Sequence, residues 1–484
     1  MPREEELKKA REHKLELLRK EGINPYPSGA KRTHNISDVL KKFPQSKSKK
    51  ISIVGRSIST RSHGKISFVD IKDESGKIQL YLSRKILKSK YEIVSHLDLG
   101  DFIEVTGKPF ITKKGEKTIE VSNFKILTKS LKPQPEQFYG FKNIEERHRK
   151  RYLDLLANPE VFNIFKKRDE IISAIREFLK SKKFTEVETP VLQPLYGGAL
   201  ARPFTTHHHV LDQKLYLRIA PELYLKRLIV GGYERIFEIG RNFRNEGVST
   251  VHNPEFTMLE LYMAFFDYQE GMKFAEEMIS SVIKKVKGSG NLEFRGKKIK
   301  IKNPFPKTTF RSAVLKFSKI DIEKHKDVKS LLSEIKKRKI KVDIPKKATW
   351  AKIVDELFKE TTRNNLMDPV FVTDHPIELN PLAKKKLDEP SKAERFQLFI
   401  GGLELINAFS ELNDPKEQLE RFKEQEHYKD DEESHKMDMD FVEALEYGMP
   451  PTTGIGMGID RLTMLLTGQE SIREVILFPA LRKK

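Results

Sequence analysis

Phe243-Arg244-Asn245-Glu246, a short loop, and His252-Asn253-Pro254-Glu255-Phe256 form the stretch that decides the fold of the large domain. The stretch separates two runs typical of strands, residues 233–239 and 256–265, and therefore predicts the mouth of a β-hairpin. At that mouth Arg244 offers planar, bidentate donors for a phosphate or a carboxylate, and Phe256 offers a ring that can stack on a base. The alternative is a surface ion pair between Arg244 and Glu246, which would contribute little to stability. The hairpin alone leaves both interpretations open.

The composition excludes several classes of protein. The chain has 484 residues and no cysteine, so disulfides, iron–sulfur clusters, thiolate zinc sites and cysteine nucleophiles are excluded, and more than one domain is expected. No apolar run approaches the roughly 18 residues that span a bilayer. The charged start Pro2-Arg3-Glu4-Glu5-Glu6 is not followed by the apolar run of a secretory signal. These features predict a soluble, cytoplasmic protein with no membrane partner.

The net charge indicates the kind of partner. Lys+Arg 91 against Asp+Glu 70 gives +21, and such a basic excess favours a polyanion such as a nucleic acid. The alternative is a generally basic protein, because the lysines are scattered along the whole chain.

Residues 51–128 predict a small β-barrel. They contain five short runs of alternating apolar and polar residues separated by turn signals, with a helical segment near 84–97 before the fourth. This pattern is typical of a Greek-key barrel of the OB type, which binds oligonucleotides on one face. Arg61, Phe68 and Gln79 would supply charge, stacking and base-edge contacts, and a base stacked on Phe68 would be worth roughly 1–3 kcal/mol. On alternation alone, Phe68 could equally be a core residue.

The rest of the chain completes an α+β organisation. We predict an N-terminal helix and lead-in over residues 1–48, the barrel over 49–130, a linker over 131–150 and a large domain over 151–484. The large domain is expected to begin with an amphipathic helix at 161–180 and a strand at 184–192 that contains Pro190. It should continue with a helical insertion at about 271–370, a hairpin at 394–412 that turns at Gly401-Gly402, and a glycine-rich strand at 454–458.

The chain lacks two common nucleotide-binding motifs. It has no G-x-x-x-x-G-K-[ST], so it is not a P-loop ATPase, and Ile459 stands where a dinucleotide-binding motif needs its third glycine. The glycines at 454–458 more plausibly allow close approach to a ligand, with Arg461 at the start of a helix facing an anion. The three consecutive histidines at 207–209 cannot chelate one metal from a strand, because adjacent side chains point to opposite faces.

Taken in order, these pieces resemble a class II aminoacyl-tRNA synthetase. The helix with Pro190 is similar to the first motif of that class, which builds the dimer interface; Phe243 to Glu246 is similar to the second, and Gly454 to Arg461 to the third. The barrel points to the subgroup with an anticodon-binding OB domain, class IIb. Nearly the whole chain resembles the bacterial type of class II lysyl-tRNA synthetase. The residues that carry this closer resemblance are Gly22-Ile-Asn-Pro-Tyr-Pro27, Arg151-Tyr-Leu-Asp-Leu155, Gly197-Gly-Ala199, Arg202-Pro-Phe-Thr-Thr-His-His208, Arg218-Ile-Ala-Pro-Glu-Leu-Tyr-Leu-Lys-Arg227, Glu260-Leu-Tyr-Met-Ala264 and Phe409-Ser-Glu-Leu-Asn413.

The resemblance implies a fold and a reaction. The fold would be a mainly antiparallel sheet flanked by helices, in a homodimer. The enzyme would activate L-lysine with ATP to lysyl-adenylate and pyrophosphate, and then transfer lysine to the 3′ end of tRNA(Lys). Arg244 would lie between the lysine carboxylate and the α-phosphate, where charge develops in the transition state. Glu246 would recognise the adenine amine, Phe256 and Arg461 would enclose the ring, and His252 and Arg461 would hold the terminal phosphates.

The resemblance also implies a lysine pocket and a metal site. Glu411 with Tyr262 would bind the ε-ammonium, and Glu222 with the Gly198 carbonyl the α-amine. Glu260, Asn407 and Phe409 would complete the pocket. Mg²⁺ would be held by Glu404, but Gln397 stands where the family has a second carboxylate. Because Phe399 should pair with Glu404 across the hairpin, Gln397 and Glu404 should share a face. We expect Mg²⁺ still to bind through Glu404 and the ATP phosphates.

Three other functions remain open at this point. Gln397 is consistent with a tRNA- or protein-binding relative that has lost adenylation. A ligase that attaches lysine to a protein is a second alternative, although such relatives lack the barrel. An aspartyl- or asparaginyl-type synthetase is disfavoured, because Glu411 places an anion where those enzymes need a cation.

Overall fold

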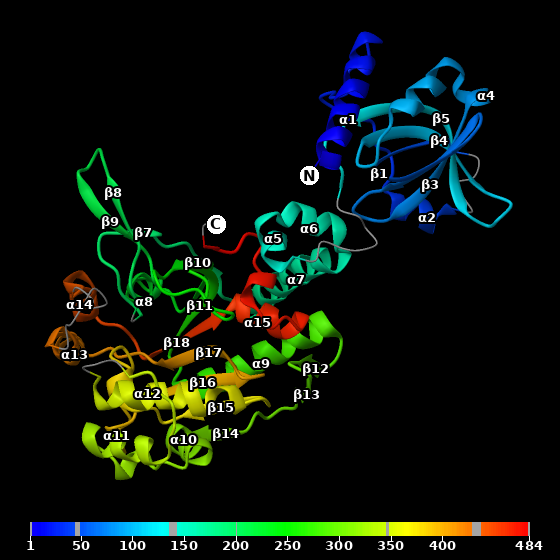
Figure 1. The fold of residues 1–484 in the computed structure, drawn as a ribbon. Helices are drawn as coiled ribbons and strands as arrows, with labels where there is room; N and C mark the ends of the chain where they lie inside the picture. Colours follow the sequence, from blue (N-terminus) through cyan, green and yellow to red (C-terminus); the bar gives the residue numbers. More distant parts are fainter. Residues whose placement is uncertain are drawn as a thin grey trace. The chain divides into compact units, whose positions relative to one another are not determined.

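The computed structural model describes residues 2–43, 49–134, 143–199, 201–344, 348–427 and 437–482. The chain divides into two compact units, Met1–Lys142 with Tyr152–Asn158, and Asn143–Arg151 with Pro159–Lys484. Figure 1 shows the elements of each unit. Of the expected linker at 131–150, residues 135–142 lie outside the described residues, and the part that follows them forms the helix α5 (Ile144–Arg149) rather than a linker. No helix in the described ranges is long and apolar enough to cross a membrane.

The first unit confirms the OB-type barrel. Its strands close in the order β1-β2-β3-β5-β4, with β3 and β5 parallel and the other neighbours antiparallel. The helical segment before the fourth strand is also present. The elements are α1 (Pro2–Lys20), α2 (Ile36–Lys41), β1 (Ile51–His63), β2 (Ile66–Lys72), β3 (Lys77–Ser83), α4 (Arg84–Leu87), the 3₁₀ helix η1 (Lys88–His96), β4 (Phe102–Ile111) and β5 (Lys117–Thr128).

The strand alternation places Phe68 outside the barrel core. Its neighbours Val69 and Ser67 are buried, whereas Phe68 is only half-buried. Phe68 pairs with Tyr81 of β3, and the centroids of their rings are 5.5 Å apart. The interpretation of Phe68 as a core residue was therefore wrong, and its ring is available on the outer face.

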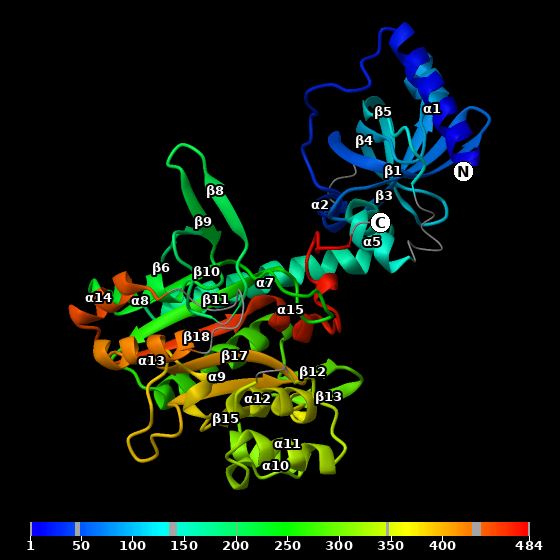
Figure 2. The same cartoon turned by 60° about the vertical axis from the view of Figure 1, so that its left-hand side comes forward.

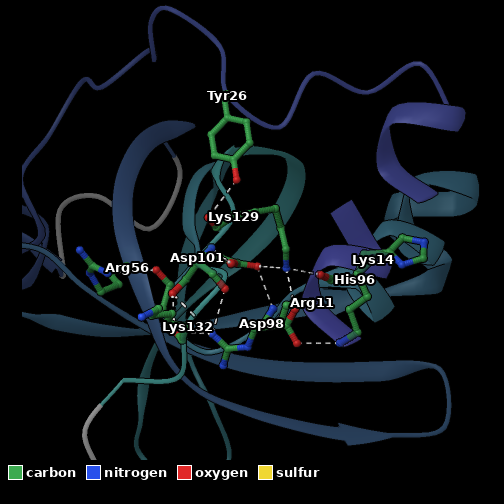
Figure 3. Close-up of polar contacts among 11 residues, drawn as sticks. Arg11, Lys14, Tyr26, Arg56, His96, Asp98, Asp101, Lys129 and Lys132 are labelled. Atoms are coloured by element: carbon green, nitrogen blue, oxygen red, sulfur yellow. Dashed lines mark hydrogen bonds and ion pairs between the residues drawn. The ribbon is translucent and has the colours of Figure 1, made fainter. Parts of the chain in front are cut away.

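A buried polar network anchors α1 and the end of β5 to the barrel (Figure 3). The fully buried Lys129 ammonium lies 2.7 Å from an Asp98 carboxylate oxygen and 2.6 Å from one of Asp101. From α1, Lys14 pairs with Asp98 at 2.7 Å, and Arg11 donates to the Ser130 carbonyl at 2.9 Å. Buried charges persist only where they are paired in this way, so this network belongs to the folded core of the unit.

The second unit is built on a sheet with the order β14-β15-β16-β17-β18-β11-β10-β6. All neighbours are antiparallel except β14 with β15 and β10 with β6, which confirms the mainly antiparallel sheet. The strands are β6 (Thr185–Glu186), β10 (Arg235–Phe243), β11 (Glu255–Ala264), β14 (Lys307–Thr309), β15 (Val370–Thr373), β16 (Arg395–Ile400), β17 (Leu403–Ser410) and β18 (Thr452–Gly458).

Helices cover one face of this sheet and form its main core (Figure 2). Apolar residues of α7 (Pro159–Ser181), α9 (Tyr268–Lys287) and α15 (Ile459–Thr467) pack there against β11, β17 and β18. The rings of Phe178 in α7 and Phe274 in α9 are 5.5 Å apart. Because helices cover this face, a polar binding site can lie only on the opposite face of the sheet.

The remaining elements include α6 (Arg151–Ala157), of which residues 152–157 belong to the first unit, and the others belong to the second unit. They are α5 (Ile144–Arg149), α6 (Arg151–Ala157), β7 (Leu192–Gln193), β8 (Thr205–His208), β9 (Gln213–Leu217), α8 (Glu222–Val230), β12 (Asn291–Phe294), β13 (Lys297–Lys300), α10 (Phe310–Ser318), η2 (Ile322–Lys324), α11 (Val328–Lys337), α12 (Trp350–Thr361), η3 (Arg363–Asn365), η4 (Ile377–Leu379), α13 (Pro415–His427), α14 (Met439–Glu446) and η5 (Ile472–Glu474). The histidines 207–209 lie at the exposed end of the β8–β9 hairpin.

Two expected elements differ from the structure. The insertion is narrower than residues 271–370, because α9 belongs to the main core and β14 and β15 extend the central sheet. Only α10, α11 and α12 form a separate helical layer with its own apolar cluster. The strand expected at 184–192 is two short strands, β6 and β7, because Pro190 between them has no N–H to donate to a sheet.

Both predicted hairpins are present. In the first, β10 pairs with β11 from Arg235↔Met263 to Phe243↔Glu255, so β10 runs further than residue 239 and Arg244 follows it directly. In the second, Phe399 of β16 pairs with Glu404 of β17, as expected.

Candidate active site

Three neighbouring strands form the floor of the site. Along β11, Leu259 and Leu261 face the apolar core, so Glu260 and Tyr262 face the other side. The same period of two places Asn407 and Phe409 of β17 beside the glycines of β18. At Gly454 a side chain is excluded, because a Cβ there would collide with a carboxylate oxygen of Glu411. The glycine-rich strand therefore makes room for charged side chains on its neighbours.

Two cavities of about 270 Å³ and about 310 Å³ open on this floor. The first is lined by all the residues expected to bind lysine, which are Gly198, Glu222, Arg244, Glu260, Tyr262, Asn407, Phe409 and Glu411. The second is lined by all those expected to bind ATP, which are Arg244, Glu246, His252, Phe256, Glu404 and Arg461. Arg244, Met258, Asn407 and Gly456 line both cavities. Two ligands could therefore meet at Arg244.

Arg244 is held at this junction by the hairpin. Its backbone N–H donates to the Pro254 carbonyl at 2.8 Å across the mouth, and its guanidinium carbon lies 5.1 Å from the centre of the Phe256 ring. Burial lowers the pKa of Arg244, and the nearby Glu246, Glu260 and Glu404 oppose this shift. An arginine remains charged in proteins, so the junction carries a fixed cation that faces both cavities.

The second cavity is suited to an anion. Arg363 and Arg461 line it in addition to Arg244, and Arg461 also donates from Nη1 to the Glu404 carbonyl at 3.0 Å. Burial lowers the pKa of Arg461 to about 10, with Glu404 opposing and the other two arginines reinforcing the shift. Arg461 is therefore a cation at neutral pH. The three positive charges repel one another at this short range, and a bound polyphosphate would offset that repulsion.

His252 lines the second cavity, as expected of a phosphate-binding residue, and its charge state is set by its surroundings. Burial, followed by the fields of Arg461, Arg363 and Arg244, lowers the pKa of His252 to about 4. Its Nδ1 lies 2.9 Å from the Ser249 hydroxyl. At neutral pH His252 is therefore a neutral hydrogen-bonding group.

The first cavity is acidic. Glu222, Glu260 and Glu411 are each less than about a tenth exposed. Burial and then Glu222 raise the pKa of Glu260 to about 8. Burial also raises the pKa of Glu411, although Lys226 opposes that shift. These carboxyl groups would gain from a cationic ligand, because an ammonium group offsets the cost of burying their charge.

Glu404 and Gln397 do share a face, as the hairpin predicted. Burial works against ionisation of Glu404, but the surrounding arginines and a hydrogen bond from Gln397 lower its pKa overall. The Gln397 amide oxygen lies 2.9 Å from Nε2 of the buried His375. Because an ionised carboxylate only accepts hydrogen bonds, the Gln397 NH₂ faces Glu404 and the amide oxygen faces His375.

This arrangement fits Mg²⁺ at Glu404 but not at Gln397. Glu404 is an anionic oxygen donor in a cavity suited to phosphates, whereas the oxygen of Gln397 is occupied by His375. Among the described residues, no group of three or more His, Cys, Asp or Glu could hold a metal by itself. Mg²⁺ commonly binds through one or two carboxylates and substrate phosphates.

In the barrel, the structure gathers the three residues expected to bind an anticodon. Arg61 is directly opposite Phe68 on the β1–β2 hairpin, and Gln79 follows on β3. The Gln79 side-chain oxygen accepts a hydrogen bond from Thr118 at 3.0 Å, which leaves the NH₂ group for another partner. Sequence reasoning missed Tyr81, which lies between Phe68 and Phe110 and extends the aromatic surface. The ring centroids of Tyr81 and Phe110 are 5.9 Å apart.

Sequence reasoning also missed several charged residues near the cavities, among them Arg395 in the wall of the first. Arg363 and Lys359 line the second cavity, and Lys226 lies behind the first. Nothing in the local pattern around Arg363 distinguishes it from a surface arginine. Lys226 had a weak signal, because it follows Glu222 by one helical turn in an otherwise apolar helix.

Comparison with known proteins agrees with this geometry. Residues 143–482 match the family of class II tRNA synthetases (D, K and N), and residues 51–127 match the OB-fold nucleic acid binding domain. The chain thus belongs to the class II tRNA synthetases. It is 49% identical to the lysine–tRNA ligase of Carboxydothermus hydrogenoformans over 482 residues, which cover 99% of this chain and 98% of that relative. It is 48% identical to the lysine–tRNA ligase of Roseiflexus castenholzii over 486 residues, covering 99% of each. Within the class, it is a member of the lysine–tRNA ligase family.

Proposed function

We propose that this chain joins lysine to ATP at Arg244 and then transfers lysine to the 3′ end of tRNA(Lys). The observation that carries the proposal is that Arg244 lines both the acidic cavity and the arginine-rich cavity. Lysine would occupy the first cavity and ATP the second. A lysine carboxylate oxygen would attack the α-phosphorus, and pyrophosphate would leave. A hydroxyl of the terminal adenosine would then attack the activated carbonyl, and AMP would leave.

The protein contributes positioning and charge rather than an acid–base relay. Arg244 would contact the carboxylate and the α-phosphate together, so its charge acts where negative charge accumulates. Arg461 would hold the remaining phosphates, with His252 as a neutral partner. Phe256 would stack on the adenine ring, and Glu246 would accept from its amine.

Selection of lysine would depend on the acidic cavity. Glu411 would pair with the ε-ammonium, while Glu222 and the Gly198 carbonyl would hold the α-amine. Tyr262, Glu260, Asn407 and Phe409 would close the walls. A site that pairs buried polar groups with a substrate amine rejects analogues that lack it by roughly 10⁴-fold. Lysine-dependent ATP–pyrophosphate exchange across a panel of amino acids, followed by charging of tRNA(Lys), tests this function. Absence of exchange at saturating Mg²⁺ would disprove it.

The proposal extends to the cofactor and the assembly. Mg²⁺ would bind at Glu404 and neutralise charge on the ATP phosphates. The barrel would read the anticodon through Arg61, Phe68 and Gln79. A homodimer in the cytoplasm is the expected state, and sedimentation of the purified chain would show whether it is a dimer.

Gln397 provides a test of the metal site. We expect Gln397→Glu to bind divalent ions more tightly, because a second carboxylate beside a cation adds at least about 1 kcal/mol, or roughly fivefold in affinity. Mn²⁺ titration followed by electron paramagnetic resonance, with a non-hydrolysable ATP analogue present, measures this directly. The Mg²⁺ concentration for half-maximal exchange should fall in parallel. Unchanged binding in both measurements would show that the missing charge has no effect at this site.

Glu260 provides a pH test. With a pKa of about 8, Glu260 carries a proton at neutral pH. An ammonium ion beside it favours the carboxylate, so lysine binding should release a proton and strengthen as pH rises toward 8, then level off. Calorimetry in two buffers of different ionisation enthalpy measures the proton release. In Glu260→Gln the number of protons released per bound lysine should fall by about one. An unchanged number would show that Glu260 is not the source of the proton.

A further inference from the structure

A buried lysine lies behind the wall of the acidic cavity. Lys226 of α8 is fully buried, and its Nζ donates to Glu222 Oε1 at 2.7 Å. The same ammonium forms an ion pair with Glu411 Oε2. The rings of Phe409 and Phe441 lie 5.6 Å and 5.8 Å from it. The amine of Lys226 thus bridges the two carboxylates that would bind the two amino groups of the substrate.

The bridge leaves one oxygen of each carboxylate uncommitted. Glu222 Oε2 points toward Gly198, where it would be 3.5 Å from a Cβ built on that glycine. Both oxygens of Glu411 are buried without a well-aligned hydrogen-bond donor, but Oε2 is in the ion pair with Lys226, whereas Oε1 points toward Gly454 and has no charged partner. A buried acceptor without a donor is costly, so this oxygen is suited to a cationic ligand. Both uncommitted oxygens belong to residues that line the first cavity.

We propose that Lys226 is a positioning residue for substrate selection: by holding one oxygen of Glu222 and one of Glu411, it sets the separation of the two oxygens that receive the α- and ε-ammonium groups. This inference rests on the proposed function. A fixed separation selects for chain length. Ornithine, which is one methylene shorter than lysine, cannot reach both oxygens without a distortion.

Two effects of Lys226 on lysine binding oppose each other. Its positive charge repels the substrate ammonium groups, so its removal would relieve that repulsion. However, removal also leaves Glu222 and Glu411 without their shared counter-ion in a buried site, which is the larger effect. Burial and the neighbouring carboxylates already raise the pKa of Glu411 with Lys226 present. Without the bridge, the carboxyl groups would take up protons and turn, and weaker, less selective binding would result.

The test is Lys226→Met, which keeps the length of the side chain and removes the ammonium group. In ATP–pyrophosphate exchange we expect KM for lysine to rise about 30-fold, as for loss of one partner of a buried charge pair. The kcat at saturating lysine should change by less than about threefold, because Arg244 and the ATP cavity are intact. The ratio of kcat/KM for lysine to that for ornithine should fall about tenfold.

The barrel offers a matched control. Lys129 is also fully buried between two carboxylates, Asp98 and Asp101, but it lies in the other unit (Figure 3). We expect Lys129→Met to lower the stability of the barrel and to leave both the lysine KM and the lysine-to-ornithine ratio unchanged. If the loss of any buried lysine had the same general effect, the lysine KM and the lysine-to-ornithine ratio would change alike in Lys226→Met and Lys129→Met.

The selectivity ratio keeps the test decisive if Lys226→Met folds poorly, because the ratio does not depend on the amount of active enzyme. Lys226→Gln, which retains one donor, should give an intermediate ratio. An unchanged ratio in both variants would overturn the role of Lys226. If the unaltered chain shows no lysine-dependent exchange at all, the proposed function fails instead, so the two failures are distinguishable.

Discussion

Arg244→Ala is expected to abolish adenylation, with kcat for lysine-dependent ATP–pyrophosphate exchange falling about 1,000-fold or more. Loss of one preorganised donor at a developing charge costs roughly 10²–10³ in rate, and Arg244 would serve two reacting groups at once. Its position supports this expectation, because it is the charged residue common to both cavities. Steady-state exchange at saturating lysine and ATP measures the effect.

The hairpin itself provides the control for this variant. Arg241 lies on β10, three residues before Arg244, with a side chain that is 45% exposed, and its carboxylate partner Glu255 is 4.0 Å away. Arg241→Ala should change exchange by less than about twofold, because exposed ion pairs contribute little. The affinity for tRNA(Lys) carried by the barrel should remain largely intact in both variants. Exchange that persists in Arg244→Ala within tenfold of the unaltered chain would contradict the proposed geometry.

Glu411→Gln is expected to have the second largest effect, a fall of about 10³-fold in kcat/KM for lysine. The change preserves shape but removes the buried anion that would pair with the ε-ammonium. It also removes one of the two partners of Lys226, so the ammonium groups of Lys226 and of the substrate would compete for the remaining charge. Most of the loss should appear in KM for lysine, and KM for ATP should stay within about threefold.

The control for Glu411→Gln is an exposed carboxylate in the same unit. Glu420 of α13 is exposed, and Glu420→Gln should leave KM for lysine unchanged. Thermal denaturation of all variants separates lost binding from lost folding. A lysine KM that is unaffected in Glu411→Gln would place the ε-ammonium elsewhere in the cavity.

Local sequence patterns determined much of the site. The turn at Gly401-Gly402 predicted the pairing of Phe399 with Glu404. Beyond Phe399 the register of this hairpin shifts at a bulge, which the turn did not predict. The resemblance named Glu260 and Tyr262, and period-two alternation explains why both lie on one face of β11. These rules hold over short distances, because a strand has only two faces and a tight turn sets the register of the pairs nearest to it. The predicted OB barrel is present for the same reason, although alternation could not say which face of the barrel holds Phe68.

Other features depended on contacts between distant segments. The sequence places Lys226 one turn after Glu222, but only the packing of α8 against β11 of the sheet brings Glu411, which follows β17, to the same ammonium. Likewise, Gln397 was recognised as a missing charge. Its orientation was settled by His375, a buried residue outside the hairpin.

The sequence by itself therefore determined the Arg244 hairpin, the glycine-rich strand, the barrel and the family. The hairpin, the strand and the barrel follow from local patterns that short-range backbone geometry is enough to specify, and the order of the motifs indicates the family. Only the tertiary structure decided that Arg244 joins two cavities, that His252 is neutral, and that Lys226 bridges two carboxylates. The physical reason is that burial and charge–charge interactions depend on distances in space, which the chain sets only when segments far apart in sequence pack together.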